Sequence, residues 1–224
     1  MSSKRCPRCG LINFAAEEAC KRCGAVIAEA NVREAGENPP VSRRPLWLLK
    51  RVLVIMGVVA VILLGFYGSL LKSSERLSYD QRQVLEKSIG VLEQSGFSRE
   101  TFVLRNLVAF RSTDNWWNQW VGHREAYAAT NFPFEVVTLY PEFFKTATDD
   151  TERAAILLHE TYHLYGSGEA AALEKTWRHK RRLGWTSERY SQTKVWRNTR
   201  ELTLNHVPQL FRCGLEQNAD CTEF

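Results

Sequence analysis

The sequence predicts an α+β domain of about 150 residues, preceded by a small cysteine-rich module and one membrane-spanning helix. Three observations support this organisation. Four cysteines form two closely spaced pairs within the first 24 residues, and a run of twenty residues further along carries no charge. The rest of the 224-residue chain alternates stretches with helical and with extended patterns, and it is long enough to bury a core of its own.

The first module, residues 1–28, contains two Cys-x-x-Cys motifs, formed by Cys6 with Cys9 and by Cys20 with Cys23, each followed directly by glycine. This spacing is typical of a zinc ribbon, in which four thiolates hold one structural zinc ion. We expect the module to be unfolded without its metal, because a segment this short cannot bury a core. Pairing of these cysteines in disulfides is the alternative.

The charged and aromatic residues of this ribbon indicate what kind of partner it binds. Arg8, Lys21 and Arg22 make the cysteine motifs basic, which suits nucleic acid. Three charges are few, however, and Phe14 is the single aromatic residue of the ribbon, so there is no platform for stacking bases. We therefore expect the ribbon to bind a protein partner and do not expect it to bind nucleic acid.

A linker and a membrane helix follow the ribbon. Residues 29–45 contain one glycine and three prolines, which is typical of a linker. Residues 46–71 include the uncharged run, and twenty helical residues span a hydrocarbon core of about 30 Å. Trp47 lies at one border and Phe66 and Tyr67 near the other, where interfacial aromatics are common. We expect a retained single-pass anchor, because the stretch is longer than the apolar region of a cleaved signal peptide.

Charge and cysteine usage indicate an orientation. Residues 1–51 hold ten Lys and Arg against five Asp and Glu, so the net charge of +5 belongs to the N-terminal side. The ribbon thiols need a reducing compartment, whereas Cys213 and Cys221 enclose a short loop that could close as a disulfide on an oxidising side. Two free thiols are the alternative. We predict a cytoplasmic N-terminus and an extracytoplasmic domain.

Residues 72–224 are predicted to form the α+β domain. Apolar residues at helical spacing predict helices over residues 73–96 and 187–205, and a third helix over 169–183 ends at Gly184. β-branched and aromatic residues predict strands over 101–110 and 134–140. Thr148, Asp149 and Asp150 predict the start of another helix, because carboxylates cap free N–H groups there.

That last helix contains the most informative motif of the chain, His159-Glu160-x-x-His163. Residues four apart share one helix face, so both imidazoles can reach a single metal ion. Glu160 lies slightly to one side, where it can act on a water molecule instead of on the metal. The apolar residues on both sides of the motif favour a half-buried site over two unrelated surface histidines.

A catalytic zinc ion usually has three protein ligands and one open position. The run His159-Glu160-x-x-His163-x-x-Gly166-x-x-Glu169 has the spacing of the metzincin signature, with glutamate at the third ligand position. Gly166 permits the positive φ with which the chain can leave the helix and return a ligand to the metal. Glu169 is the predicted third ligand, and Glu174 on the same helix is the reserve candidate.

In these residues the sequence resembles the zincin metallopeptidases, over roughly residues 134–185. It departs from the metzincins, because the methionine turn is missing and both methionines lie far upstream. In its glutamate third ligand the sequence is similar to the gluzincins, which place this ligand on the next helix. In this chain Ser167 would cap that helix. The resemblance implies a zincin-like α+β fold and a catalytic zinc ion, in addition to the structural zinc ion that the cysteine spacing predicts in the ribbon.

The resemblance also implies a mechanism. Zinc would polarise the scissile carbonyl and acidify its water, while Glu160 would act as general base. Tyr165, His179 and Tyr190 are candidates for stabilising the oxyanion, and the sequence does not choose among them. Zincins lay the substrate along a strand edge, and residues 136–140 are the predicted edge for a peptide.

Trp116, Trp117 and Trp120 form a cluster that we expect to pack the domain; a groove for peptide or glycan and a position at the membrane surface are the alternatives. The predicted function is that of a membrane-anchored zinc metallopeptidase acting on a peptide or protein. One alternative is a non-catalytic membrane adaptor or sensor that keeps a zincin-like scaffold and binds a partner through its ribbon. Another is hydrolysis of a non-peptide amide by the same chemistry.

Overall fold

The computed structural model describes residues 3–27, 44–121, 126–214 and 219–223, and the chain divides into two compact units, Met1–Val59 and Ala60–Phe224. Most of the predicted linker, residues 29–45, lies outside the described residues. The second unit mixes helices with a small sheet, which confirms the α+β prediction.

The N-terminal unit contains a short hairpin of β1 (Ser3–Arg5) and β2 (Ile12–Phe14), which pair antiparallel. A cysteine motif follows each strand. Cys6, Cys20 and Ile27 are buried and form the whole apolar centre of the described ribbon. So small a centre cannot stabilise a fold alone, as expected of a module whose structure depends on a metal.

Helix α1 (Arg44–Lys72) contains the predicted anchor. From Trp47 to Lys72 its mean hydropathy over the most apolar window is 2.5, and that window is entirely exposed. It is the one helix in the described part of the chain that is long and apolar enough to cross a membrane. From Phe66 onward its side chains become partly buried, and Leu70 is fully buried in the second unit.

The sheet of the second unit has three strands in the order β3-β5-β4. β3 (Ala109–Arg111) pairs parallel with β5 (Val136–Leu139), and β4 (Ala128–Asn131) pairs antiparallel with β5. The prediction that residues 136–140 form a free edge is therefore wrong, because β5 is hydrogen-bonded on both sides. The edge next to helix α6 is β4.

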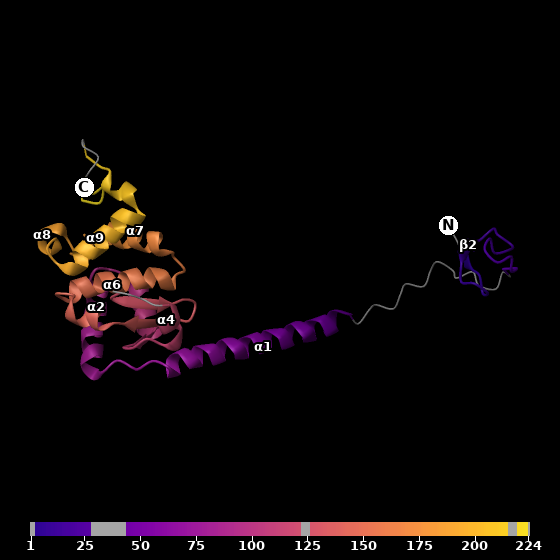
Figure 1. Cartoon of the computed structure of the whole chain (residues 1–224), viewed down its shortest axis with the longest axis horizontal. Helices are drawn as coiled ribbons and strands as arrows, with labels where there is room; N and C mark the ends of the chain where they lie inside the picture. The colour runs from indigo at the N-terminus through magenta and orange to yellow at the C-terminus, as the bar shows by residue number, and fades with distance from the viewer. Residues whose placement is uncertain (1–2, 28–43, 122–125, 215–218, 224) are drawn as a thin grey trace. The chain divides into compact units, whose positions relative to one another are not determined.

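The described part of the second unit has five longer helices, of which α6 packs against the sheet through β4: α2 (Tyr79–Gln94), α3 (Ser98–Asn106), α6 (Asp150–Leu164), α7 (Glu169–His179) and α9 (Lys194–His206). α6 packs against both α2 and α7, and α7 packs against α9 (Figure 1). Shorter elements complete the unit, namely α4 (Trp116–Val121), α5 (Pro141–Lys145), α8 (Ser187–Tyr190) and the 3₁₀ helix η2 (Pro208–Phe211).

Two predicted elements differ in the structure. Residues 101–106 belong to helix α3 instead of a strand, since Thr101 and Leu104 face the core at helical spacing and Glu100 and Arg105 suit the two helix ends. The helix predicted over 187–205 is broken into α8 and α9. The hydroxyl of Thr193 accepts a hydrogen bond from the N–H of Trp196 and so starts a new helix.

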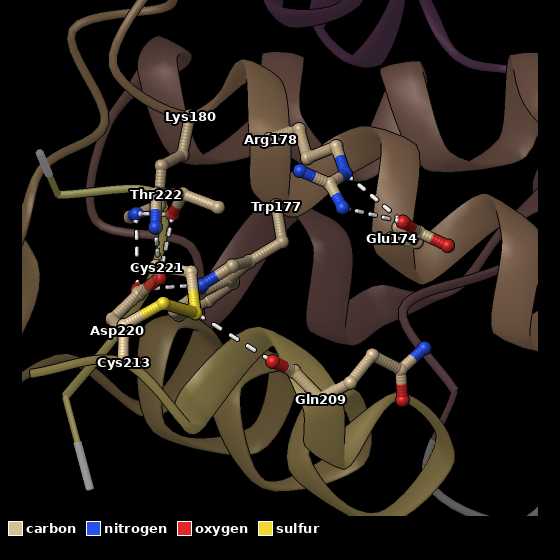
Figure 2. Close-up of a disulfide and its surroundings, with 9 residues drawn as sticks. All are labelled: Glu174, Trp177, Arg178, Lys180, Gln209, Cys213, Asp220, Cys221 and Thr222. Carbon is tan, nitrogen blue, oxygen red and sulfur yellow. Dashed lines mark hydrogen bonds and ion pairs between the residues drawn. A yellow bond between two sulfur atoms is a disulfide. The ribbon is translucent and has the colours of Figure 1, made fainter. Parts of the chain in front are cut away.

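The C-terminal residues form a loop closed by a disulfide, and a charged cluster fixes this loop to the end of α7. Cys213 and Cys221 are bonded to each other, and Asp220 beside them contacts Lys180 at 3.0 Å and accepts a hydrogen bond from Trp177 Nε1 at 2.7 Å. Figure 2 shows these side chains close together beside the disulfide. Lys180 is fully buried, and the carboxylate of Glu223 also lies 2.9 Å from its ammonium group, so two carboxylates compensate the buried charge.

Candidate metal centres

Helix α6 positions the His-Glu-x-x-His motif. It begins where the sequence predicts, with Asp149 accepting hydrogen bonds from the N–H groups of Thr151 and Glu152. Alanines and leucines of the helix are buried around the motif, so its register is fixed by packing on α2 and β4. Both histidines consequently face the same side and remain half-buried.

Three side chains meet at this face. Nε2 of His159 lies 3.0 Å from Nε2 of His163. The carboxylate of Glu169 reaches both, at 3.5 Å from His159 and 3.1 Å from His163. The structure therefore brings together the three residues that the sequence analysis selected as ligands.

The turn between α6 and α7 returns Glu169 to the histidines. Gly166 has a φ of +76°, the left-handed conformation that favours glycine. The carbonyl of Ser167 lies 2.9 Å from Nδ1 of His163, so Nδ1–H can donate to it while Nε2 faces His159 and Glu169. Ser167 does not cap α7 as predicted, because Gly168 occupies the cap position and the Ser167 hydroxyl accepts a hydrogen bond from Lys175.

Glu174, the reserve ligand, points elsewhere. Its carboxylate forms an ion pair with Arg178 one turn along α7, at 2.8 Å, and Figure 2 shows the two side chains together. Glu174 does not belong to the group of ligand atoms that lie within 4.8 Å of one another at His159, His163 and Glu169. The structure thus separates the two glutamates, which the sequence alone leaves open.

Glu160 is held apart from this group. Its side chain is 5 % exposed, and its Oε2 accepts a hydrogen bond of 2.7 Å from the hydroxyl of Thr130 on β4. A buried carboxylate needs such a partner, and the bond also fixes its rotamer. Thr130 was missed from the sequence, because nothing in the short run before it indicates that β4 would lie against α6.

The charges of the group influence one another. Hydrogen bonds from His159 and His163 hold the pKa of Glu169 far below its usual value. The same contact with Glu169 raises the pKa of His163, although burial acts in the opposite direction. Glu169 and His163 thus stabilise each other's charged forms and are an electrostatically coupled pair.

A cavity of about 510 Å³ opens in front of the three side chains. β4, the turn after it, and helices α6, α7 and α9 supply its walls, which are largely apolar. Tyr127 and Asn198 are polar groups on this wall, and the Asn198 amide donates a hydrogen bond to the Tyr127 hydroxyl at 3.1 Å. A cavity of this size accommodates several residues of an extended peptide or a small molecule.

The three candidates for oxyanion stabilisation do not line this cavity. Tyr190 donates a hydrogen bond to Asp149 at the start of α6. His179 packs against Phe97, and Tyr165 lies under the guanidinium of Arg99. Their positions result from helix packing, which the sequence does not specify at this level.

The second group is the ribbon. The sulfur atoms of Cys6 and Cys23 lie 3.6 Å apart and those of Cys9 and Cys20 lie 3.5 Å apart, so that all four surround one position and can hold a metal ion. The backbone N–H of Arg22 lowers the pKa of Cys20 to about 6, as suits a thiolate ligand. Asn13, missed from the sequence, directs its amide toward Cys20 sulfur at 3.7 Å.

Comparison with known proteins adds no relative. The chain matches no protein-family model, no curated protein sequence and no solved structure.

Proposed function

We propose that this chain is a membrane-anchored zinc metallopeptidase of zincin type. The observation that carries the proposal is the convergence of His159, His163 and Glu169 at the mouth of a cavity, with the buried carboxylate of Glu160 beside them. A chance pair of surface histidines would not have a third acidic ligand returned by a glycine turn. Nor would it have a separately anchored glutamate next to it.

The donor set fits zinc. Ligand atoms about 2.0 to 2.1 Å from a tetrahedral ion lie about 3.3 Å from each other. Nε2 of His159 and Nε2 of His163 lie 3.0 Å apart, one carboxylate oxygen of Glu169 lies 3.5 Å from the first, and the other oxygen lies 3.1 Å from the second. Two imidazoles and one carboxylate form a common ligand set of catalytic zinc, and they leave the fourth position free.

Different residues of the chain would have different roles in the reaction. Zinc, when bound, would act as a Lewis acid on the scissile carbonyl and on a water molecule. Glu160 would take a proton from that water and give it to the leaving amine, and Thr130 would hold the carboxylate in position. Asn198 lines the same cavity and is one of the polar residues that could contact the substrate backbone.

Strand β4 would orient the substrate. As the outer strand next to the cavity it can pair with an extended peptide. The N–H of Tyr140 donates a hydrogen bond to the carbonyl of Tyr127. In an antiparallel ladder, residues that are hydrogen-bonded to the neighbouring strand alternate with residues that are not. The backbone groups of Ala128 and Thr130 therefore point away from β5. Helix α1 would anchor the enzyme, with the ribbon in the cytoplasm and the disulfide-containing unit outside.

The first test counts zinc in the full-length protein in detergent. We expect two zinc ions per chain in the parent protein and one after Glu169→Gln, because the catalytic site loses its anionic ligand. Glu174→Gln is the matched control on the same helix and should retain two. Equal zinc content in both variants would remove Glu169 from the site.

The second test separates binding from chemistry. Glu160→Gln should keep both zinc ions and lose at least about 100-fold in peptide cleavage, since an amide cannot act as the base. Cleavage is measured against a peptide library, with the zinc content of the same sample as control. A variant that cleaves at the parental rate would refute the assigned mechanism. A parent protein that binds two zinc ions and cleaves no peptide would favour an adaptor.

A further inference from the structure

Three tryptophans of the second unit are not buried in its core. Trp120 is 77 % exposed, and Trp116 and Trp117 are also exposed, all on the short helix α4. Trp177, Trp185 and Trp196 of the same unit are buried. Large aromatic side chains exposed side by side on a folded domain indicate an interaction surface.

This surface lies against the end of the apolar helix. The ring of Phe66 lies 5.4 Å from that of Trp116 and 6.1 Å from that of Trp117. Trp116 also donates a hydrogen bond from Nε1 to the hydroxyl of Ser69 at 3.1 Å. Trp116 and Trp117 therefore pack against α1 where its side chains become partly buried, and Trp120 lies beside Trp117.

The position matches the boundary of a bilayer. A helix needs about 20 residues to cross a hydrocarbon core of about 30 Å. Counted from Trp47, at the start of the apolar stretch, such a crossing ends near Phe66. Tryptophan is enriched at the level where the acyl chains meet the headgroups, because its ring is apolar and its N–H is polar.

Basic groups lie at the same end. Lys72 closes α1, and Arg76, just beyond it, pairs through backbone with Arg111. Arg111 is 8 % exposed, and its Nε has no hydrogen-bond partner among the described residues. Neither arginine forms an ion pair with a carboxylate in the described part of the chain. Exposed Lys72 and Arg76 complement lipid phosphates.

The cavity is connected to this surface through the turn between β4 and β5. The ring of Phe134 in that turn lies 5.0 Å from the ring of Phe66. Phe132, two residues earlier and 61 % exposed, lines the cavity. Two peptide units span at most about 7 Å, so the rim of the cavity lies close to the end of the apolar helix.

We propose that Trp116, Trp117 and Trp120 form a membrane-seating surface, which lies in the headgroup region of the bilayer that α1 enters and holds the cavity beside it. The occupant is lipid, because the surface continues directly from an apolar membrane-length helix and basic side chains border it. The inference rests on the membrane anchor of the proposed function. It narrows the substrate class to peptide segments next to the membrane surface.

The test uses full-length protein in vesicles whose lipids are brominated near the headgroup end of the acyl chain, because bromine quenches tryptophan only on contact. Seven tryptophans share the emission. Trp120→Phe should lower the quenched fraction, because a lipid-exposed emitter is lost. Trp196→Phe, the matched control, should raise it, because a buried emitter is lost. Near-ultraviolet circular dichroism verifies that both variants are folded.

Each outcome has a distinct meaning. A quenched fraction that Trp120→Phe leaves unchanged or raises would overturn the seating surface while leaving the anchor intact, since Trp47 would still report contact with lipid. If acrylamide also fails to quench Trp120 in the parent protein, another protein or a second copy of this chain covers that side chain. An absence of all quenching would remove both the anchor and the seating surface. None of these results depends on zinc or on cleavage.

Discussion

At the scale of single residues, Thr130 is the clearest case of a side chain that acts through another. Its hydroxyl is the described donor to the carboxylate of Glu160, and it contacts neither histidine. Thr130→Val keeps the shape of the side chain and removes the donor. We expect about a tenfold loss of kcat with zinc content unchanged, as for other residues that orient catalytic groups. Restoration by Thr130→Ser would confirm a positioning role, whereas equal loss in both variants would indicate a packing effect.

Asp220 determines stability at the other end of the unit. It contacts the buried ammonium of Lys180 at 3.0 Å. Replacement by Asn keeps the shape and removes the charge, so we expect a loss of about 2 kcal/mol of unfolding free energy at neutral pH. Chemical denaturation of both proteins measures this difference. Glu174→Gln, which breaks an exposed pair, should cost less than about 1 kcal/mol.

The pH dependence of that difference follows from the pKa of Asp220. Burial raises this pKa, but hydrogen bonds from Thr222 and the charge of Lys180 outweigh burial and hold it below its ordinary value of 3.8. The carboxylate therefore binds protons less readily in the folded state, and its stabilisation is complete above about pH 4. It declines as the pH falls through the folded pKa. The unfolding free energies of the parent protein and of Asp220→Asn should therefore differ by a constant amount from pH 6 to about 4, and this difference should shrink at lower pH. Divergence at low pH would contradict the assignment.

At the scale of elements, the connection between α6 and α7 shapes the candidate site. Gly166→Ala would place a side chain at a φ of +76°, which costs about 1 to 2 kcal/mol and would displace Glu169. We expect weaker zinc binding at the catalytic site, measured by competition with a chelator. Gly168→Ala is the control two residues on, since its φ of −71° suits any residue and no atom lies within 4 Å of the added carbon. Equal affinities would mean that the turn does not position the ligand.

The sequence predicts helices better than strands in this unit, for a physical reason. Asp149 and Gly166 mark the ends of α6, so that element follows from local capping and periodicity alone. The assignment of β5 as central and β4 as edge depends on which distant segments pair, and three- or four-residue strands carry little pattern. The strand predicted over residues 101–110 rests on β-branched and aromatic residues such as Thr101 and Phe102. Residues 101–106 are helical instead, because the same side chains also fit a short amphipathic helix.

At the scale of the whole molecule, spacing along the chain identified both groups of donor atoms. The ribbon cysteines and the pair His159 and His163 are local, so their geometry follows from a few turns of backbone. Thr130, in contrast, lies 30 residues before Glu160 in the chain. Asn198, a polar residue of the cavity lining, lies on α9. Only the fold brings these residues to the site. The disulfide is also local, since Cys213 and Cys221 are eight residues apart.

The disulfide has a practical consequence for preparing the protein. Four free thiols at one end and a disulfide at the other set opposite requirements on a buffer. A reductant strong enough to protect the ribbon can open the C-terminal loop, and a metal-free ribbon thiolate can attack that disulfide by exchange, within one chain or between chains. Cross-linked oligomers are thus the expected contaminant of any sample refolded in a single compartment. Zinc should be loaded before the oxidant is added.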